Sequence, residues 1–209
     1  MPTRARPSVA SRKQPKQARS TQLVADILTA AAQVLARDGA HRFTTTRVAE
    51  KAGVSVGSLY QYFPNKEAVL FRLQHDEWTA TAALLDRILS DAALAPRDRL
   101  RKAVREFFRT EWEEARMRRA LGDAAPYYRD TPEATRHRQA GRRALQAFMR
   151  QAVPSLGGAR RAVAADLIGM TLGAVGKSVS ETAASPAQVD RYARAAADML
   201  CAYLQRLSA

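Results

Sequence analysis

The stretch TTTRVAEKAGVSVGSLYQYFPNKEAV, residues 44–69, decides how this chain folds. Its apolar residues recur at helical spacing, yet two glycines, several hydroxyl residues and a proline interrupt them at short intervals. Thr44 or Thr45 can cap the start of a short helix with its hydroxyl. Val48, Ala49 and Ala52 then give that helix one apolar face. The interruptions therefore predict short helices that end where the chain must turn.

A tight turn follows this first short helix. Gly53 can adopt the left-handed conformation that ends a helix at low cost, and Ser55 can cap the next helix. The second helix spans about Val56 to Tyr62 and turns Leu59 toward the interior. The pattern predicts a helix-turn-helix. The outward face of its second helix is formed by Val56, Gly57, Ser58 and Gln61.

This outward face is small and almost uncharged, so its backbone can approach another surface closely. Hydrogen-bond donors suited to phosphate oxygens surround the face. These donors are Thr44, Thr45, Arg47, Tyr60, Tyr62 and Lys66. Asn65 and Glu67 suit the positive end of the following helix, whose free N–H groups can also hold a phosphate. A small helix face ringed by donors indicates contact with a nucleic acid.

The rest of the chain predicts helices and no strand, because apolar residues keep helical spacing and show no convincing alternation. A first helix runs from about Ser20 to a stop at Gly39, and a long helix begins near Lys66 and ends before LAPRD. Further helices begin near residues 96, 132, 159 and 186. We expect an all-α fold of about nine helices, with a helix-turn-helix domain at 20–66 and a second helical domain at 67–209.

Charge is unevenly distributed along the 209 residues, which carry a formal net charge of +14. Residues 1–66 hold eleven Lys and Arg against three acids, and residues 67–209 hold 23 against 17. Residues 1–19 contain six of these cations, three prolines and no acid, so we expect a flexible basic arm. The arm either contacts DNA or is a solvated tail without a contact role. Charge alone admits nucleic acid or an anionic membrane as the partner.

Cysteine use and hydropathy indicate in which cellular compartment the protein resides. Cys201 is the only cysteine, so we expect no disulfide and no thiolate metal cluster within one chain. No run of 18 apolar residues appears, and no apolar segment follows the basic N-terminus. We expect a cytoplasmic, nucleoid-associated protein with no membrane partner, metal or cofactor.

The segment AGVSVGSLYQYFPNKEAV, preceded by FTTTRVAE and by a first helix that ends at Gly39, resembles the DNA-binding domain of TetR-type one-component transcriptional regulators, which are usually repressors. The resemblance covers about residues 20–70 and rests on Ala-Gly-Val-Ser, Gly-x-Leu-Tyr, Tyr-x-Tyr-Phe and Lys-Glu at fixed offsets. Beyond these residues the chain matches only in helix number and order. The resemblance implies that the later helices bind an effector and form a homodimer, which would bind a palindromic operator.

The resemblance assigns roles only to residues inside the motif. The residues that would hold phosphates are Thr44, Thr45, Tyr60, Tyr62 and Lys66. The residues that would face base edges are Ser55, Val56, Gly57 and Ser58. Val56 departs from the family, because many members carry Lys or Arg there to read guanine. A valine offers only apolar contact, so we expect recognition to depend on DNA shape, phosphates and the arm. The arm residues that can enter an adjacent minor groove are Arg4, Arg6, Arg12 and Lys13.

Aromatic and methionine side chains of the second domain can line a cavity for an apolar or aromatic effector. The candidates are Trp78, Phe107, Phe108, Trp112, Met117, Tyr127, Tyr128, Phe148 and Met170, with His137 as a polar group in or near the pocket. Such side chains also build ordinary cores, and the sequence leaves both readings open.

Small residues line one side of the penultimate helix, which allows another helix to approach closely. The final helix carries apolar residues at compatible spacing. Together they predict a four-helix dimer interface, as the resemblance also implies. The expected interface residues are Gly169, Gly173, Gly176, Val189, Tyr192, Ala196, Met199, Leu200 and Tyr203. Packing within one chain is the alternative.

Arginines concentrate in the middle helices, at positions 116, 118, 119, 136, 138, 142 and 143. They can pair with the glutamates at 111, 113, 114 and 133 on a solvated surface, or they can attract an anionic effector. The sequence does not separate these two readings.

Together the motif and the helical second domain predict a sequence-specific DNA-binding transcriptional regulator. We expect a repressor that a small molecule releases from its operator. An effector-independent architectural DNA-binding protein is the alternative, favoured by the net charge and by the weak base-reading side chains. No catalytic triad order, phosphate loop or zinc motif has support in the sequence, so we do not expect an enzyme.

Overall fold

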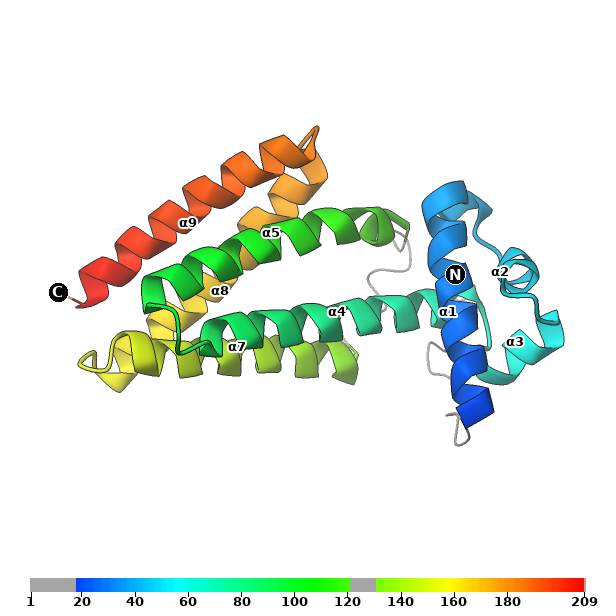
Figure 1. Ribbon diagram of the computed structural model, residues 1–209, viewed down its shortest axis with the longest axis horizontal. Coiled ribbons are helices and arrows are strands. Elements are labelled where there is room, and N and C mark those ends of the chain that lie inside the picture. The colour runs from blue at the N-terminus through cyan, green and yellow to red at the C-terminus, as the bar shows by residue number, and fades with distance from the viewer. Residues whose placement is uncertain (1–17, 121–130, 209) are drawn as a thin grey trace, which may run out of the picture. The chain divides into compact units, whose positions relative to one another are not determined.

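The computed structural model describes residues 18–120 and 131–208, without the side chains of residues 40 and 116–120. Within these ranges the chain forms eight α-helices, one short 3-10 helix and no strand (Figure 1). This confirms the predicted all-α class of about nine helices. The elements are α1 (Ala18–Asp38), η1 (Ala40–Arg42), α2 (Thr45–Ala52), α3 (Val56–Tyr62), α4 (Lys66–Ser90), α5 (Pro96–Ala120), α7 (Pro132–Ala152), α8 (Gly158–Thr182) and α9 (Pro186–Ser208).

Prolines and glycines set several helix boundaries where the sequence predicts them. Pro96, Pro132 and Pro186 occupy the first positions of α5, α7 and α9, where a missing N–H costs no helical hydrogen bond. Gly39 follows α1 with a φ of 74°, a conformation that strains residues with a side chain. In contrast, α4 contains neither proline nor glycine and continues unbroken for 25 residues.

The chain divides into two compact units, and α4 passes from the first to the second between Glu77 and Trp78. The first unit contains α1, η1, α2, α3 and the first half of α4, together with residues 116–120 and 131–134. Its most buried core side chains, at most 1% exposed, include Ile27, Val34, Phe43, Val48, Leu59, Phe63 and Val69. Because α1 packs against α2 and α2 against α3, this core fixes the position of α3 within the unit.

The second unit contains the rest of α4, most of α5, and α7, α8 and α9. Its most buried core side chains, again at most 1% exposed, include Leu100, Val104, Phe108, Phe148, Met149, Ile168 and Ala197. The buried Arg99 donates to the Leu89 carbonyl at 3.0 Å and to Gln151 Oε1 at 2.7 Å. This one guanidinium therefore ties the ends of α4 and α7 to the start of α5.

Helix α8 combines length with an apolar composition. By those two properties alone it is able to cross a membrane, and 33% of its most apolar 18-residue stretch is buried inside the protein. A buried share of this size leaves much of α8 exposed, and its exposed side chains bear on the assembly of the protein.

Candidate nucleic-acid interface and effector unit

Local hydrogen bonds build the turn between α2 and α3. Thr44 caps α2, because its hydroxyl accepts the Arg47 N–H at 3.2 Å. Gly53 ends α2 with a φ of 68°, and its N–H donates to the Glu50 carbonyl at 3.2 Å. The left-handed glycine thus sets the direction in which the chain enters α3.

Helix α3 has a buried side and an open side. Ser55 caps the helix by accepting the Ser58 N–H at 3.0 Å. Leu59 is fully buried on the inner side, whereas Gly57 and Gln61 are exposed on the outer side. A Cβ added at Gly57 would meet only the Ser55 hydroxyl oxygen, at 3.8 Å, among the described residues. Packing within the described chain therefore does not require glycine at this position.

The predicted phosphate donors differ in their exposure. Tyr60 is 39% exposed, and its hydroxyl lies 3.1 Å from the Thr45 hydroxyl, so these two groups from α3 and α2 form one polar cluster. Lys66 is exposed at the start of α4. Tyr62 is buried in the core of the first unit, and the half-buried Val56 packs against that core.

Arg47, another predicted contact, lies beside an acid at the end of α1. Its guanidinium is 3.5 Å from the Asp38 carboxylate, which also accepts hydrogen bonds from Arg37 at 2.7 and 3.0 Å. The hydrogen bonds from Arg37, together with the positive charges of Arg37, Arg47 and Arg42, hold the pKa of Asp38 below its ordinary value. The carboxylate therefore stays ionised and orients Arg47.

The remaining predicted contacts of the first unit have mixed outcomes. Asn65 caps α4 by accepting the Ala68 N–H at 2.8 Å, as its position in the sequence predicts. The predicted arm contacts lie outside the described residues, at Arg4, Arg6, Arg12 and Lys13. No group of three or more His, Cys, Asp or Glu that could hold a metal ion occurs in the part of the chain that the structure describes.

Two of the predicted effector contacts meet in the second unit. The rings of Trp78 on α4 and His137 on α7 lie with their centroids 5.7 Å apart and their planes at 58°. The structure therefore brings an indole and an imidazole together between two helices. The side chains of Met117, Tyr127 and Tyr128 lie outside the described part of the chain.

The other predicted pocket residues divide into three groups. Phe107 and Trp112 are half-buried and pack against the core of the second unit. Phe108 and Phe148 are 1% exposed and belong to that core. Met170, in contrast, is 65% exposed on α8.

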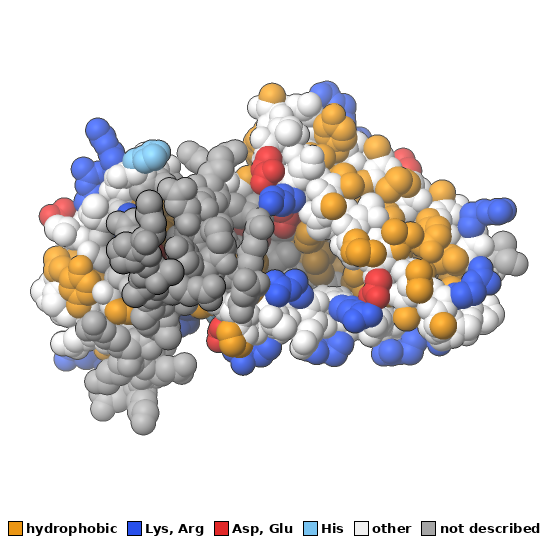
Figure 2. All heavy atoms as spheres, turned by 180° about the vertical axis from the view of Figure 1, so that it is seen from behind, with side chains coloured by type: hydrophobic (Ala, Val, Ile, Leu, Met, Phe, Trp, Pro, Cys, Tyr) orange, Lys and Arg blue, Asp and Glu red, His pale blue; other side chains and the backbone are white. Residues whose placement is uncertain are grey.

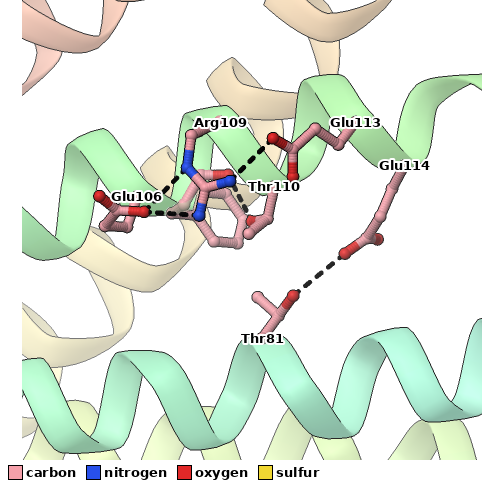
Figure 3. Close-up of polar contacts among 7 residues, drawn as sticks. Thr81, Glu106, Arg109, Thr110, Glu113 and Glu114 are labelled. Atoms are coloured by element: carbon pink, nitrogen blue, oxygen red, sulfur yellow. Dashed lines mark hydrogen bonds and ion pairs between the residues drawn. The ribbon is translucent and has the colours of Figure 1, made fainter.

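The structure adds a polar pair that periodicity does not reveal. The Thr81 hydroxyl on α4 donates to the Glu114 carboxylate on α5 at 3.1 Å, and Glu114 is 5% exposed (Figure 3). The two residues are 33 positions apart, and only the packing of α4 on α5 joins them. In the same view Arg109 bonds Glu106 and Glu113 along α5. Glu114 thus places a carboxylate inside the unit.

The predicted dimer residues of α9 fall on two sides of the helix. Val189, Ala196 and Leu200 are buried in the core of their own chain. Tyr192 and Met199 are 48% and 53% exposed. A second predicted tyrosine on this helix, at position 203, is half-buried against the core.

The predicted glycines of α8 are also in different surroundings. A Cβ at Gly176 would lie 2.8 Å from the Phe107 ring, and one at Gly169 would lie 3.1 Å from Leu145, so both glycines permit close packing within the chain. Gly173 is exposed, and a Cβ there would meet nothing within 4 Å among the described residues.

An exposed apolar face runs along α8. Val163, Leu167 and Met170 are 65%, 43% and 65% exposed, and their spacing of four and three residues places them on one side of the helix. Figure 2 shows hydrophobic side chains gathered over one broad face of this unit. A soluble monomer rarely exposes such a contiguous apolar patch without a partner.

An open helix-turn-helix followed by a separate all-helical unit defines a class of protein, the DNA-binding regulators that carry their own binding or assembly unit. The family model of bacterial regulatory proteins of the tetR family matches residues 27–73. A second model, the tetracyclin repressor-like C-terminal domain, matches residues 95–207, which is more than half of the chain. The chain belongs to the TetR family, and it is accordingly a cytoplasmic DNA-binding transcriptional regulator.

Individual relatives agree with this assignment. The fatty acid metabolism regulator protein of Bacillus subtilis (strain 168) is 43% identical over 47 residues, which is 22% of this chain and 24% of the relative. The match therefore spans about a quarter of that curated relative's length.

Solved structures extend the similarity of fold to most of the chain. The fatty acid degradation regulator FadR from Bacillus halodurans has a TM-score of 0.65 at 19% identity, covering 90% of this chain and 97% of its own. FadR from Bacillus subtilis in complex with stearoyl-CoA has a TM-score of 0.62 at 17% identity, covering 85% and 97%. At these identities the likeness concerns the fold alone.

Proposed function

We propose that this regulator is a nucleoid-associated repressor that binds a palindromic operator as a homodimer and is released by a small-molecule effector. The observation that carries the proposal is the outer side of α3. Gly57 and Gln61 are exposed there, Leu59 anchors the inner side, and packing among the described residues does not require the glycine. A helix so small and open suits insertion into a major groove.

Phosphate contacts hold α3 in the groove. The hydroxyls of Thr45 and Tyr60 are hydrogen-bonded to each other at 3.1 Å, so one donates to the other and the accepting hydroxyl keeps its own proton for a phosphate. Arg47, oriented by Asp38, and the exposed Lys66 add charged contacts. These groups fix the position of the protein on DNA without reading sequence.

Base reading falls to the short side chains at the start of α3. Val56 lacks the donors that bind guanine, so it contributes at most an apolar contact to a thymine methyl group. Specificity then depends on Ser55, Ser58 and Gln61, on DNA shape, and on the basic arm at residues 1–19 in a neighbouring minor groove.

Dimerisation follows from the exposed apolar residues of α8 and α9. Val163, Leu167 and Met170 on α8 are matched on α9 by Tyr192 and Met199, all exposed by 43% or more. When the same two helices of a second chain cover them, a four-helix interface results. Gly173 lets the helices approach closely, since its surroundings are open. This interface also accounts for the apolar composition of α8.

The effector is apolar or aromatic and binds the second unit near Trp78 and His137. The aromatic pair and the half-buried Phe107 and Trp112 supply apolar contact area. The stearoyl-CoA complex of the Bacillus subtilis FadR, a protein of similar fold, supports a ligand with a long apolar part.

Release is a shift between two conformations of the dimer. DNA favours the conformation in which the two α3 helices fit adjacent major grooves, about 34 Å apart. The effector favours another spacing. Helix α4 transmits the change, because it continues unbroken from the first unit into the second.

Selection of genomic fragments by the purified dimer tests the proposal. We expect enriched fragments to share two inverted half-sites whose centres lie about 10 base pairs apart or a multiple of that distance. A specific affinity close to the non-specific affinity at physiological salt would instead indicate an architectural protein. Reporter expression that falls when the gene is deleted would show activation rather than repression.

A further inference from the structure

The second unit carries a block of arginines with no acid among them. Residues 135–165, which include most of α7, the turn after it and the start of α8, contain seven arginines, no lysine and no Asp or Glu. Charged protein surfaces normally mix positive and negative side chains, because neighbouring charges of the same sign repel one another. Nothing in the helix-turn-helix accounts for this block.

Helical spacing places three of the arginines in one row. Arg136, Arg143 and Arg150 are seven residues apart on α7, and all three are exposed. Seven residues of α-helix advance about 10.5 Å, so the row spans about 21 Å. Lys and Arg side chains line the lower edge of this unit in Figure 2, where Figure 1 places α7.

Three of the seven arginines have no counterion in the part of the chain that the structure describes. Arg142 pairs with Asp166 on α8 at 2.6 Å, which is the first acid after the block. In the described part of the chain, Arg143, Arg150 and Arg160 have no ion-pair partner. Of the glutamates offered by the sequence as partners, Glu113 bonds Arg109 of its own helix instead. Exposed cations without partners do not stabilise the fold.

The chemistry of the row selects a polyanion with evenly spaced charges. The planar fork of arginine binds the oxygens of a phosphate in pairs, as it does those of a carboxylate. A row of about 21 Å matches the rise of about six base pairs at 3.4 Å each. The uncharged neighbours on this side are Gln139 and Gln146, which donate hydrogen bonds, and the small Ala140 and Ala147, and none of them offers a large apolar side chain to a lipid surface.

We propose that the α7 arginine row, formed by Arg136, Arg143 and Arg150, is a second DNA-binding surface that contacts phosphates independently of α3, together with the exposed Arg160 at the start of α8. It does not read sequence, since it offers no groove-inserting element. It lets a protein bound at its operator hold a further segment of duplex.

The test measures binding of a random-sequence 30-base-pair duplex by fluorescence anisotropy across a fourfold range of salt. The full-length chain carries Gly57→Glu and Gln61→Glu, which set carboxylates on the outer side of α3 and disable that contact. Into this background we introduce Arg143→Gln, Arg150→Gln and Arg160→Gln. Each phosphate contact adds about 0.9 to the slope of the logarithm of affinity against the logarithm of salt concentration. Loss of three contacts should therefore lower this salt slope by about 2.7, which changes the loss of affinity over the fourfold salt range by about 40-fold.

The matched control removes the same charge elsewhere. Arg87, Arg191 and Arg206 are exposed and have no ion-pair partner in the described residues, so their triple change to Gln lowers the net charge equally. We expect its slope to fall by less than one. The corresponding triple change to Lys on α7 should retain most of the binding, because charge is kept. If the α7 triple does not fold, as judged by circular dichroism, Arg143→Gln and Arg150→Gln are measured singly, at about 0.9 each.

Three outcomes overturn the inference: equal slopes for the two Gln triples, an unchanged slope for the α7 triple, or loss of binding to phosphatidylglycerol vesicles with DNA binding retained. Failure of the proposed repressor function is a separate result. It is measured in the chain with an intact α3, as the affinity for a selected operator. In that chain the α7 triple change should leave the operator affinity within about twofold of the unaltered value at physiological salt.

Discussion

Replacing Gly57 separates what the fold requires from what DNA binding requires. Glycine inside an exposed helix costs about 0.5–1 kcal/mol relative to alanine, because the unfolded chain is freer there. The structure has room for a methyl group, since among the described residues a Cβ would meet only the Ser55 hydroxyl oxygen, at 3.8 Å. Gly57→Ala should therefore raise the free energy of unfolding by up to about 1 kcal/mol, or about 2–4 °C in Tm for a chain of this size.

DNA binding should respond in the opposite direction. A side chain at position 57 stands between the α3 backbone and the groove, so a larger one moves the helix outward and weakens the base contacts of Ser55 and Ser58. Loss of about one good base contact costs about 1.4 kcal/mol or more, which lowers the affinity at least tenfold. We expect Gly57→Leu to bind the selected operator at least tenfold more weakly, although the protein remains folded.

The assay pairs thermal unfolding by circular dichroism, at fixed protein concentration, with fluorescence anisotropy on the operator. Gly141→Leu is the matched control, because Gly141 is also helical and exposed and has nothing within 4 Å of its added Cβ in the described structure. Its operator affinity should not change. Equal operator affinity for Gly57→Leu and the unaltered chain would refute the placement of α3 in the groove.

Three further predictions use the same two measurements or sedimentation. Gly53→Ala should lower the free energy of unfolding by about 1–2 kcal/mol, because its φ of 68° strains any residue with a Cβ, and an unchanged melting curve would contradict this. Met170→Glu should shift the dimer toward monomer in sedimentation velocity, whereas the same change at the exposed Gln205 should not; a dimer in both would remove α8 from the interface. Tyr60→Phe should weaken operator binding by about threefold to tenfold through loss of one phosphate hydrogen bond, and Thr45→Val on top of it should add little, because the two hydroxyls act together; full additivity would separate them.

Local chemistry made the helix-turn-helix predictable from sequence. The hydroxyl caps at Thr44 and Ser55 and the left-handed Gly53 act through neighbours within four residues, so their roles can be read without knowing the fold. The prolines that begin α5, α7 and α9 are equally local signals. Each of these boundaries is where the residue pattern places it.

Contacts between distant helices could not be predicted in the same way. The Trp78–His137 pair and the Thr81–Glu114 hydrogen bond join helices whose relative rotation no periodic pattern specifies. The same limit explains α9, where Leu200 and Met199 are adjacent in the sequence. One is buried and the other is exposed, because the apolar arc of the helix is wider than the surface its own chain covers.

Because α4 is unbroken, proteins of this kind can hardly gain or lose residues within that helix during evolution. Inserting one residue near Glu77 would turn everything beyond it by about 100° and advance it by about 1.5 Å, because no glycine or proline in α4 absorbs the change. The turns before α5 and α9 tolerate altered length far better. Recombination between two such genes within α4 should therefore yield an inducible chimera only when both parents supply the same number of residues to that helix.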